Sequence, residues 1–190
     1  MRFEEYKRLV LSDLYRTSGS MTFRSLLGQV FLGESYKYIF WMRTCRFIRK
    51  SLFLRIAVAN RFLKRYRYKF GIAIECTAEI GPGLQISNFG NIIVNGKARI
   101  GKNCTISQGV TVGQANRGRN KGYPVIGDNV YLGPGAKIVG AVTIGNNAAI
   151  GANCVVTRDV PENAVVVGVP GRVISYNGSE GYVLRTDYEI

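Results

Sequence analysis

Residues 126–174 read IGDNVYLGPGAKIVGAVTIGNNAAIGANCVVTRDVPENAVVVGVPGRVI, and their spacing is the clearest indication of the fold. An aliphatic residue recurs in it every six positions, and glycine often follows that residue. A period of six fits neither an α-helix, with about 3.6 residues per turn, nor an alternating strand, with a period of about two. It suits one flat side of a triangular coil, in which each short strand points its aliphatic residue inward. The aliphatic residues are Ile126, Leu132, Ile138, Ile144, Ile150 and Val156.

The same period extends upstream, and a small or medium residue often stands four positions after each aliphatic one. Three hexads would make one coil, and stacked coils would bury a continuous aliphatic ladder. The upstream aliphatic residues are Ile74, Ile80, Ile86, Val94, Ile100, Ile106 and Val112. The small or medium residues are Ala78, Ala98, Cys104, Val110, Val130, Ala136, Val142, Ala148, Cys154 and Val160.

Two insertions interrupt the period, one between Ile86 and Val94 and one between Val112 and Ile126. Insertions in a repeat array become loops on one face, and that face often binds ligand. The second insertion contains residues 114–125 (QANRGRNKGYPV), which are glycine-rich and basic. We expect this loop to project from the coil.

Residues 1–70 show helical spacing instead of the repeat. The pattern predicts a first helix that residues 17–20 (TSGS) end, a second over residues 22–31, and one or two amphipathic helices over residues 34–70. Residues 177–180 read as loose, and the last ten residues read as a tail. The predicted division is a basic helical region (1–70), a β-helix domain (71–175) and a C-terminal tail (176–190).

The net charge of +14 is concentrated in the helical region. Residues 1–70 hold 16 Lys and Arg against 4 Asp and Glu, whereas residues 71–190 hold 10 against 8. This basic segment suits either the anionic inner face of a membrane or a solvated helical cap. Nucleic acid is disfavoured as a partner, because the basic segment contains no recognisable nucleic-acid-binding motif. The basic residues include Arg43, Arg46, Arg49, Lys50, Arg61, Lys64, Arg65 and Arg67.

Other sequence features point to a cytoplasmic protein with no metal site. The N-terminal residues MRFEEYKRLVLSDLY do not resemble a signal peptide, and arginines interrupt the most hydrophobic region, residues 36–58. The four cysteines form no close pair, and the chain has no histidine to complete a zinc site. We therefore expect four reduced cysteines that pack as small apolar residues.

The repeat region resembles the closing coils of serine acetyltransferase and its relatives. In that family the repeats end in a DVPxN turn and a GVPxRVI strand, which here are DVPEN at residues 159–163 and GVPGRVI at residues 168–174. SQGVTVGQ at residues 107–114 resembles the strand before the family's active-site loop. This resemblance spans residues 70–175. It implies a mainly β fold with a left-handed parallel β-helix, and a homotrimer with acetyl-CoA in grooves between neighbouring coils.

Six residues are candidates for the CoA groove, and all of them except Gly113 fall at positions where relatives line it. Arg158 and Arg172 suit the phosphates of CoA, because guanidinium groups pair well with phosphate. Ala152 leaves space for the thin pantetheine arm, and Gly113 lets the backbone approach it. The alternative is that the arginines are solvated charges and the small residues fill corners. The six residues are Gly113, Pro134, Ala152, Thr157, Arg158 and Arg172.

The family's catalytic histidine is missing. Relatives carry this general base in the first bulge, in a DHxxG pattern, but residues 87–90 are SNFG, so Asn88 stands at the histidine position. The Asp that orients the base falls on Ala73, and a further His of the loop falls on Tyr123. Glu75 is the nearest acidic candidate for another base. The alternative interpretation is that Glu75 is a solvated residue of the first coil with no catalytic role.

Three explanations of Asn88 stay open. The protein uses another base, it is a binding or structural relative that has lost activity, or Asn88 is an inactivating substitution. An amide cannot accept a proton at neutral pH, but it can donate hydrogen bonds to a hydroxyl or an oxyanion.

The resemblance implies an acetyl-CoA-dependent O-acetyltransferase. The short, basic helical region favours a sugar hydroxyl of a surface or capsular polysaccharide as the acceptor. Serine O-acetylation for cysteine synthesis is the alternative, which Ile190 leaves open because such enzymes often end in Ile. A catalytically silent trimeric β-helix scaffold is the non-enzymatic alternative.

Overall fold

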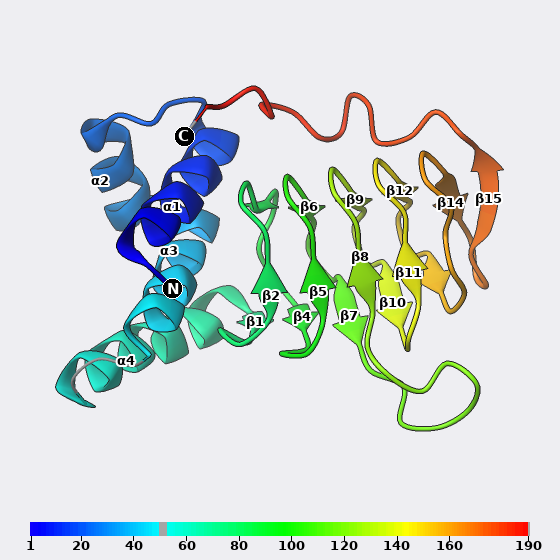
Figure 1. Cartoon of the computed structure of the whole chain (residues 1–190), viewed down its shortest axis with the longest axis horizontal. Coiled ribbons are helices and arrows are strands. Elements are labelled where there is room, and N and C mark those ends of the chain that lie inside the picture. The colour runs from blue at the N-terminus through cyan, green and yellow to red at the C-terminus, as the bar shows by residue number, and fades with distance from the viewer. Residues whose placement is uncertain (50–52, 190) are drawn as a thin grey trace.

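The computed structural model describes residues 1–49 and 53–189, and the side chains of residues 53–56 are outside the description. A helical region precedes a parallel β-helix, as Figure 1 shows, which confirms the predicted architecture. Lys50 and Ile190 lie outside the described residues. Among the described residues, no helix is long and apolar enough to cross a membrane.

Four helices form the N-terminal region. They are α1 (Phe3–Ser18), α2 (Phe23–Phe31), α3 (Ser35–Ile48) and α4 (Phe53–Phe70). α1 ends at Gly19, whose left-handed backbone (φ 73°) directs its N–H to the carbonyl of Tyr15. The Thr22 side chain accepts a hydrogen bond from the Ser25 N–H and so caps the start of α2. The predicted helix over residues 34–70 is thus a pair, α3 and α4.

Short strands form three sheets, one on each side of the coil. The first sheet contains β1 (Ile72–Ile74), β4 (Ile92–Val94), β7 (Thr111–Gly113), β10 (Lys137–Val139) and β13 (Val155–Val156). The second contains β2 (Glu79–Ile80), β5 (Arg99–Ile100), β8 (Val125–Ile126) and β11 (Thr143–Ile144). The third contains β3 (Gln85–Ile86), β6 (Thr105–Ile106), β9 (Tyr131–Leu132), β12 (Ala149–Ile150), β14 (Val165–Val167) and β15 (Arg172–Ser175).

The register of the sheets stacks the aliphatic ladder in the core. Ile74 pairs with Val94, and Val94 in turn with Val112, so equivalent residues of successive coils lie above one another. Every ladder residue predicted from the sequence is buried, and so is every small or medium residue predicted beside it. Each buried Ile or Val contributes about 1.5–3 kcal/mol relative to an exposed one.

Asparagines at the corner between the second and third sheets form a second ladder. Asn103, Asn129, Asn147 and Asn163 all have positive φ, between 55° and 59°, a conformation that asparagine tolerates better than most residues. Each side-chain amide donates to the next carbonyl oxygen, at 3.0 Å, 2.9 Å and 3.1 Å along the series. We call this corner the asparagine edge.

The C-terminal residues run back along the asparagine edge toward the helices (Figure 1). The Ser179 N–H donates to the Asn147 carbonyl at 2.8 Å, and its hydroxyl donates to the Asn129 carbonyl at 2.6 Å. Farther along, Arg185 donates to the Thr17 carbonyl at 2.9 Å. The prediction that residues 177–180 are loose is therefore wrong, because outward-facing carbonyls of the coil hold them.

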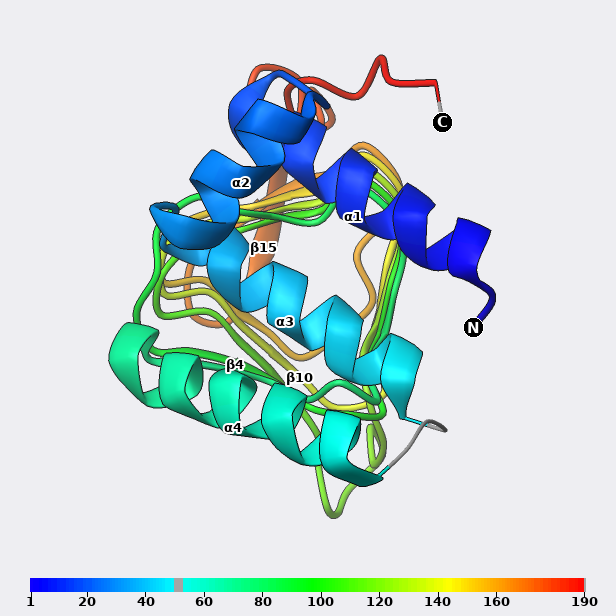
Figure 2. The ribbon, with the colours of Figure 1, turned by 90° about the vertical axis from the view of Figure 1, so that its left-hand side faces the viewer.

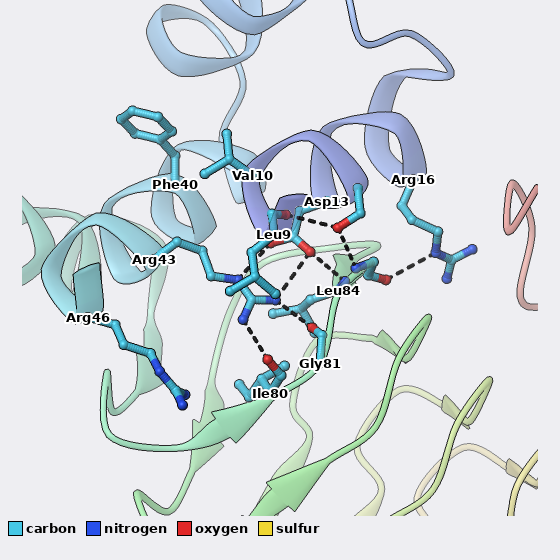
Figure 3. Close-up of polar contacts among 12 residues, drawn as sticks. Leu9, Val10, Asp13, Arg16, Phe40, Arg43, Arg46, Ile80, Gly81 and Leu84 are labelled. Carbon is cyan, nitrogen blue, oxygen red and sulfur yellow. Dashed lines mark hydrogen bonds and ion pairs between the residues drawn. The ribbon is translucent and has the colours of Figure 1, made fainter. Parts of the chain in front are cut away.

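A buried ion pair joins α1 and α3 to the open end of the first coil (Figure 3). Arg43 Nε lies 2.8 Å from Asp13 Oδ2, and both side chains are almost fully buried. The other guanidinium nitrogens of Arg43 donate to the Ile80 and Gly81 carbonyls, each at 2.7 Å. The Leu84 N–H donates to Asp13 Oδ1 at 2.7 Å.

This contact corrects the prediction that places Arg43 and Arg46 in a basic segment that faces a membrane or solvent. Arg43 lies on the buried side of α3, because the first coil has no coil above it and its free carbonyls need donors. Arg46 also donates to a carbonyl of the first coil, that of Ala78. Neither residue belongs to a free basic surface.

Candidate active site

The candidate residues lie along the two edges of the first sheet. Asn88, Pro134 and Ala152 follow β3, β9 and β12, so they share the corner that leads from the third sheet to the first. We call this corner the Asn88 edge. The other corner, from the first sheet to the second, is the loop edge. It carries Glu75, Gly113, Tyr123, Thr157 and Arg158.

The bulge that carries Asn88 is fixed by backbone hydrogen bonds. The Ser87 N–H donates to the Ile106 carbonyl at 3.0 Å, and the Gly109 N–H donates to the Gly90 carbonyl at 2.8 Å. The Phe89 ring packs edge-on against Phe70 at 5.4 Å between centroids. The Asn88 side chain is exposed and makes no hydrogen bond within the described part of the chain. Its amide is therefore available to an external partner.

Glu75 does not lie near Asn88 within one chain. The bulge adjoins the start of β1, where the Ile92 N–H donates to the Gly71 carbonyl, whereas Glu75 follows the end of β1. Glu75 is four positions beyond Gly71 along extended strand, which is a span of about 13 Å. A proton cannot pass directly over that distance. Glu75 can therefore act as general base for an acceptor hydroxyl at Asn88 only if the two residues come from different chains.

The positions where relatives carry the orienting Asp and the further His of the loop hold no catalytic group in this chain. Ala73 lies in the middle of β1, paired with Ile93, and its methyl group cannot orient a base. Tyr123 is half-buried at the end of the loop, with Lys97 Nζ 5.2 Å from its ring centroid.

The loop of residues 114–125 projects from the coil, as predicted, and appears in Figure 1 as the long excursion between β7 and β8. Ala115 and Gly122 exchange backbone hydrogen bonds at 3.0 Å and close its base. Asn120 anchors it to later coils, because its side-chain amide donates to the Thr157 carbonyl at 2.5 Å. The Asn120 carbonyl accepts from the Ala141 N–H at 2.8 Å. Sequence reasoning missed Asn120, since nothing in the repeat period marks it.

A hollow of ≈ 260 Å³ on the last coil brings Thr157, Arg158 and Arg172 together. Both arginines are exposed, and neither has an ion-pair partner among the described residues. The Asp159 carboxylate in the same hollow is engaged by the Thr143 N–H at 2.8 Å. Two free guanidinium groups beside one occupied carboxylate suit a phosphate-bearing ligand.

The remaining groove residues are not part of this hollow. Gly113 lies on the same edge two coils earlier, and Pro134 and Ala152 lie on the Asn88 edge. In one chain, therefore, the predicted set divides into two halves. An extended ligand could contact both halves only where the two edges of different chains face each other.

The cysteines take no part in the candidate site. All four are free thiols, and burial raises the pKa of Cys45 and of Cys104 to about 12 each. Only Cys76 is partly accessible. The described residues contain no group of His, Cys, Asp and Glu that could hold a metal ion.

The sequence of this chain is similar to one described protein family and to several serine acetyltransferases. The family description "Bacterial transferase hexapeptide (six repeats)" matches residues 123–158. A serine acetyltransferase of Staphylococcus xylosus is 44% identical over 112 residues, which are 59% of this chain and 52% of that protein. A serine acetyltransferase of Bacillus licheniformis is 38% identical over 126 residues, 66% of this chain and 58% of that protein. The chain thus spans little more than half the length of these relatives.

Solved structures are similar over a larger part of the chain. A serine acetyltransferase of Brucella abortus in complex with coenzyme A has a TM-score of 0.75 and 27% identity, over 91% of this chain and 69% of that one. A serine acetyltransferase of Neisseria gonorrhoeae in complex with serine has a TM-score of 0.72 and 28% identity, over 91% and 70%. The likeness therefore includes the helical region as well as the coil.

Proposed function

We propose that the chain is a hexapeptide-repeat acyltransferase of the serine acetyltransferase-like branch, and that it transfers an acetyl group from acetyl-CoA to a hydroxyl group. The hollow that holds Arg158 and Arg172 is the observation that carries the proposal, because acetyl-CoA is a thioester with several phosphates. The likeness to a serine acetyltransferase solved with coenzyme A supports this donor.

In the proposed reaction the acceptor hydroxyl oxygen attacks the thioester carbonyl carbon. The C–S bond then breaks, the acetyl ester forms, and CoA leaves as a thiol that carries the proton of the hydroxyl. The Asn88 amide would donate a hydrogen bond to the acceptor or to the oxyanion of the tetrahedral intermediate. It cannot take the proton, so turnover is slower by about 10²–10⁴-fold than with a positioned base.

Serine is the acceptor that the relatives favour. The sequence relatives and solved structures described above are serine acetyltransferases, and one of the structures contains serine. We therefore place L-serine first and the sugar hydroxyl of a polysaccharide second. The catalytically silent scaffold is a separate candidate, which the absence of histidine from the chain favours.

A homotrimer would complete the proposed site. Gly113, Thr157, Arg158 and Arg172 of one chain would face Asn88, Pro134 and Ala152 of its neighbour across a groove. This arrangement would also let Glu75 of one chain approach the acceptor at Asn88 of another. Light scattering should give three times the chain mass of 21.0 kDa, and a monomer would argue against the groove. A cytoplasmic location stays a prediction.

Calorimetry with CoA, followed by a thiol-release assay with acetyl-CoA, tests the function. We expect CoA to bind and serine to accelerate thiol release more than a sugar does. CoA binding without turnover on any hydroxyl acceptor would favour the silent scaffold. Failure to bind CoA at all would overturn the proposal.

A further inference from the structure

An apolar stripe on α2 faces solvent. None of the nine residues of α2 is buried. Phe23 is 73% exposed, Leu27 41% and Phe31 70%, and Leu32 just beyond the helix is 83% exposed. Residues four positions apart lie on one side of a helix, so Phe23, Leu27 and Phe31 form a continuous stripe, which we call the α2 stripe. Exposed aromatic and aliphatic residues grouped in this way mark a surface that a partner covers.

The α2 stripe belongs to the helical end of the molecule. Figure 2 looks onto this end and shows α2 in front of the coil, together with α1, α3 and α4. Arg24 stands within the stripe's own helix and is exposed. The stripe is far along the chain's long axis from the hollow of Arg158, which lies on the last coil (Figure 1). It is therefore separate from the proposed active site.

The helical region that carries the stripe has excess exposed positive charge even after the buried arginines are set aside. Arg16 and Arg43 are buried and cannot meet a partner. Among the described side chains of residues 1–70, ten exposed Lys and Arg remain against three exposed acidic residues, Glu4, Glu5 and Glu34. The exposed basic residues are Arg2, Lys7, Arg8, Arg24, Arg49, Arg61, Lys64, Arg65, Arg67 and Lys69.

We propose that the helical end docks on an anionic lipid surface, with the α2 stripe inserted among the lipids and exposed basic residues of the helical region on the headgroups. Binding to an anionic lipid surface strengthens with the apolar area that is inserted and with the electrostatic attraction to the headgroups, and the helical end offers both. A second copy of the chain would bring like charges together, which costs free energy. Nucleic acid would satisfy the charge but would leave Phe23, Phe31 and Leu32 without an apolar environment. The proposal does not depend on the acetyl-transfer reaction.

Vesicle flotation of the full chain tests this surface. We expect binding to vesicles that contain phosphatidylglycerol, little binding to pure phosphatidylcholine, and weaker binding as the salt concentration rises. The variant F23S/F31S should bind at least about tenfold more weakly, because it loses two inserted aromatic side chains. The variant V169S/I174S removes two apolar side chains that are 72% and 63% exposed at the far end of the coil, and it should bind as the parent does.

Three outcomes would overturn the proposal. The first is no binding of the parent chain to anionic vesicles at low salt. The second is equal binding by F23S/F31S, with its fold verified by circular dichroism. The third is a fall in the particle mass of F23S/F31S measured by light scattering, which would assign the α2 stripe to contacts between copies of the chain.

Discussion

Replacing Arg43 with methionine removes the buried cation that joins the helical region to the first coil. The substitution eliminates two hydrogen bonds to Asp13 and two to the carbonyls of Ile80 and Gly81. It leaves the Asp13 carboxyl buried without its partner. Methionine fills much of the space of the arginine stem, so the loss is mainly electrostatic.

The size of the effect follows from this arrangement. Removal of one partner from a buried ion pair costs about 3–5 kcal/mol. The two carbonyls lose their donors as well, each with a penalty of about 1–3 kcal/mol, but such losses are not additive. We therefore expect the free energy of unfolding of R43M to fall by about 4 kcal/mol. Burial already raises the pKa of Asp13 against the opposing effect of Arg43, so the variant should take up a proton at Asp13 on folding.

Urea unfolding followed by circular dichroism measures this loss. The exposed Arg49 near the end of α3 offers a matched control, and R49M should change the free energy of unfolding by less than about 0.5 kcal/mol. The double variant D13L/R43M should recover part of the loss, because no unpaired charge remains. A loss of less than about 1 kcal/mol in R43M would refute the assignment of Arg43 as the joint between helices and coil.

Four further outcomes are expected. R158A/R172A should bind CoA about 10–100-fold more weakly with an unchanged unfolding midpoint, and calorimetry that finds equal affinity would remove these arginines from the site. E75Q should leave the rate of acetyl transfer unchanged if Glu75 is only a solvated residue, whereas a fall of about 10²-fold or more would identify it as the base. S179A should lower the free energy of unfolding by about 1 kcal/mol, since it loses the hydrogen bond to Asn129, and an unchanged value would show that the C-terminal segment is loosely held. At pH 8 a thiol reagent should label Cys76 first and all four cysteines only in denaturant, because burial raises the pKa of the other three, and rapid labelling of more than one thiol would contradict this.

The coil could be predicted from the sequence because its determinants are local. Glycine follows many ladder residues, such as Ile144, and the same six-residue unit repeats along the chain. The two insertions were visible as breaks in that period. Their loops lie where the period places them, one at Asn88 and one after Gly113.

The contacts that could not be predicted join residues far apart in the chain. The sequence groups Arg43 with the other basic residues of the helical region, but its partner Asp13 is 30 residues away and its acceptor carbonyls are more distant still. The docking of Ser179 depends on backbone carbonyls, which carry no sequence signal. Three hexads make one coil, so the separation of Glu75 from Asn88 could have been found by counting sides.

The rate of CoA release from acetyl-CoA with L-serine, compared between the parent chain and N88H, tests the central proposal most directly. We expect slow, saturable release by the parent and a gain of about 10²–10⁴-fold in N88H, because histidine supplies the general base at the acceptor. No release by either protein, with CoA binding absent from both, would contradict acetyl transfer from acetyl-CoA as the function of this protein.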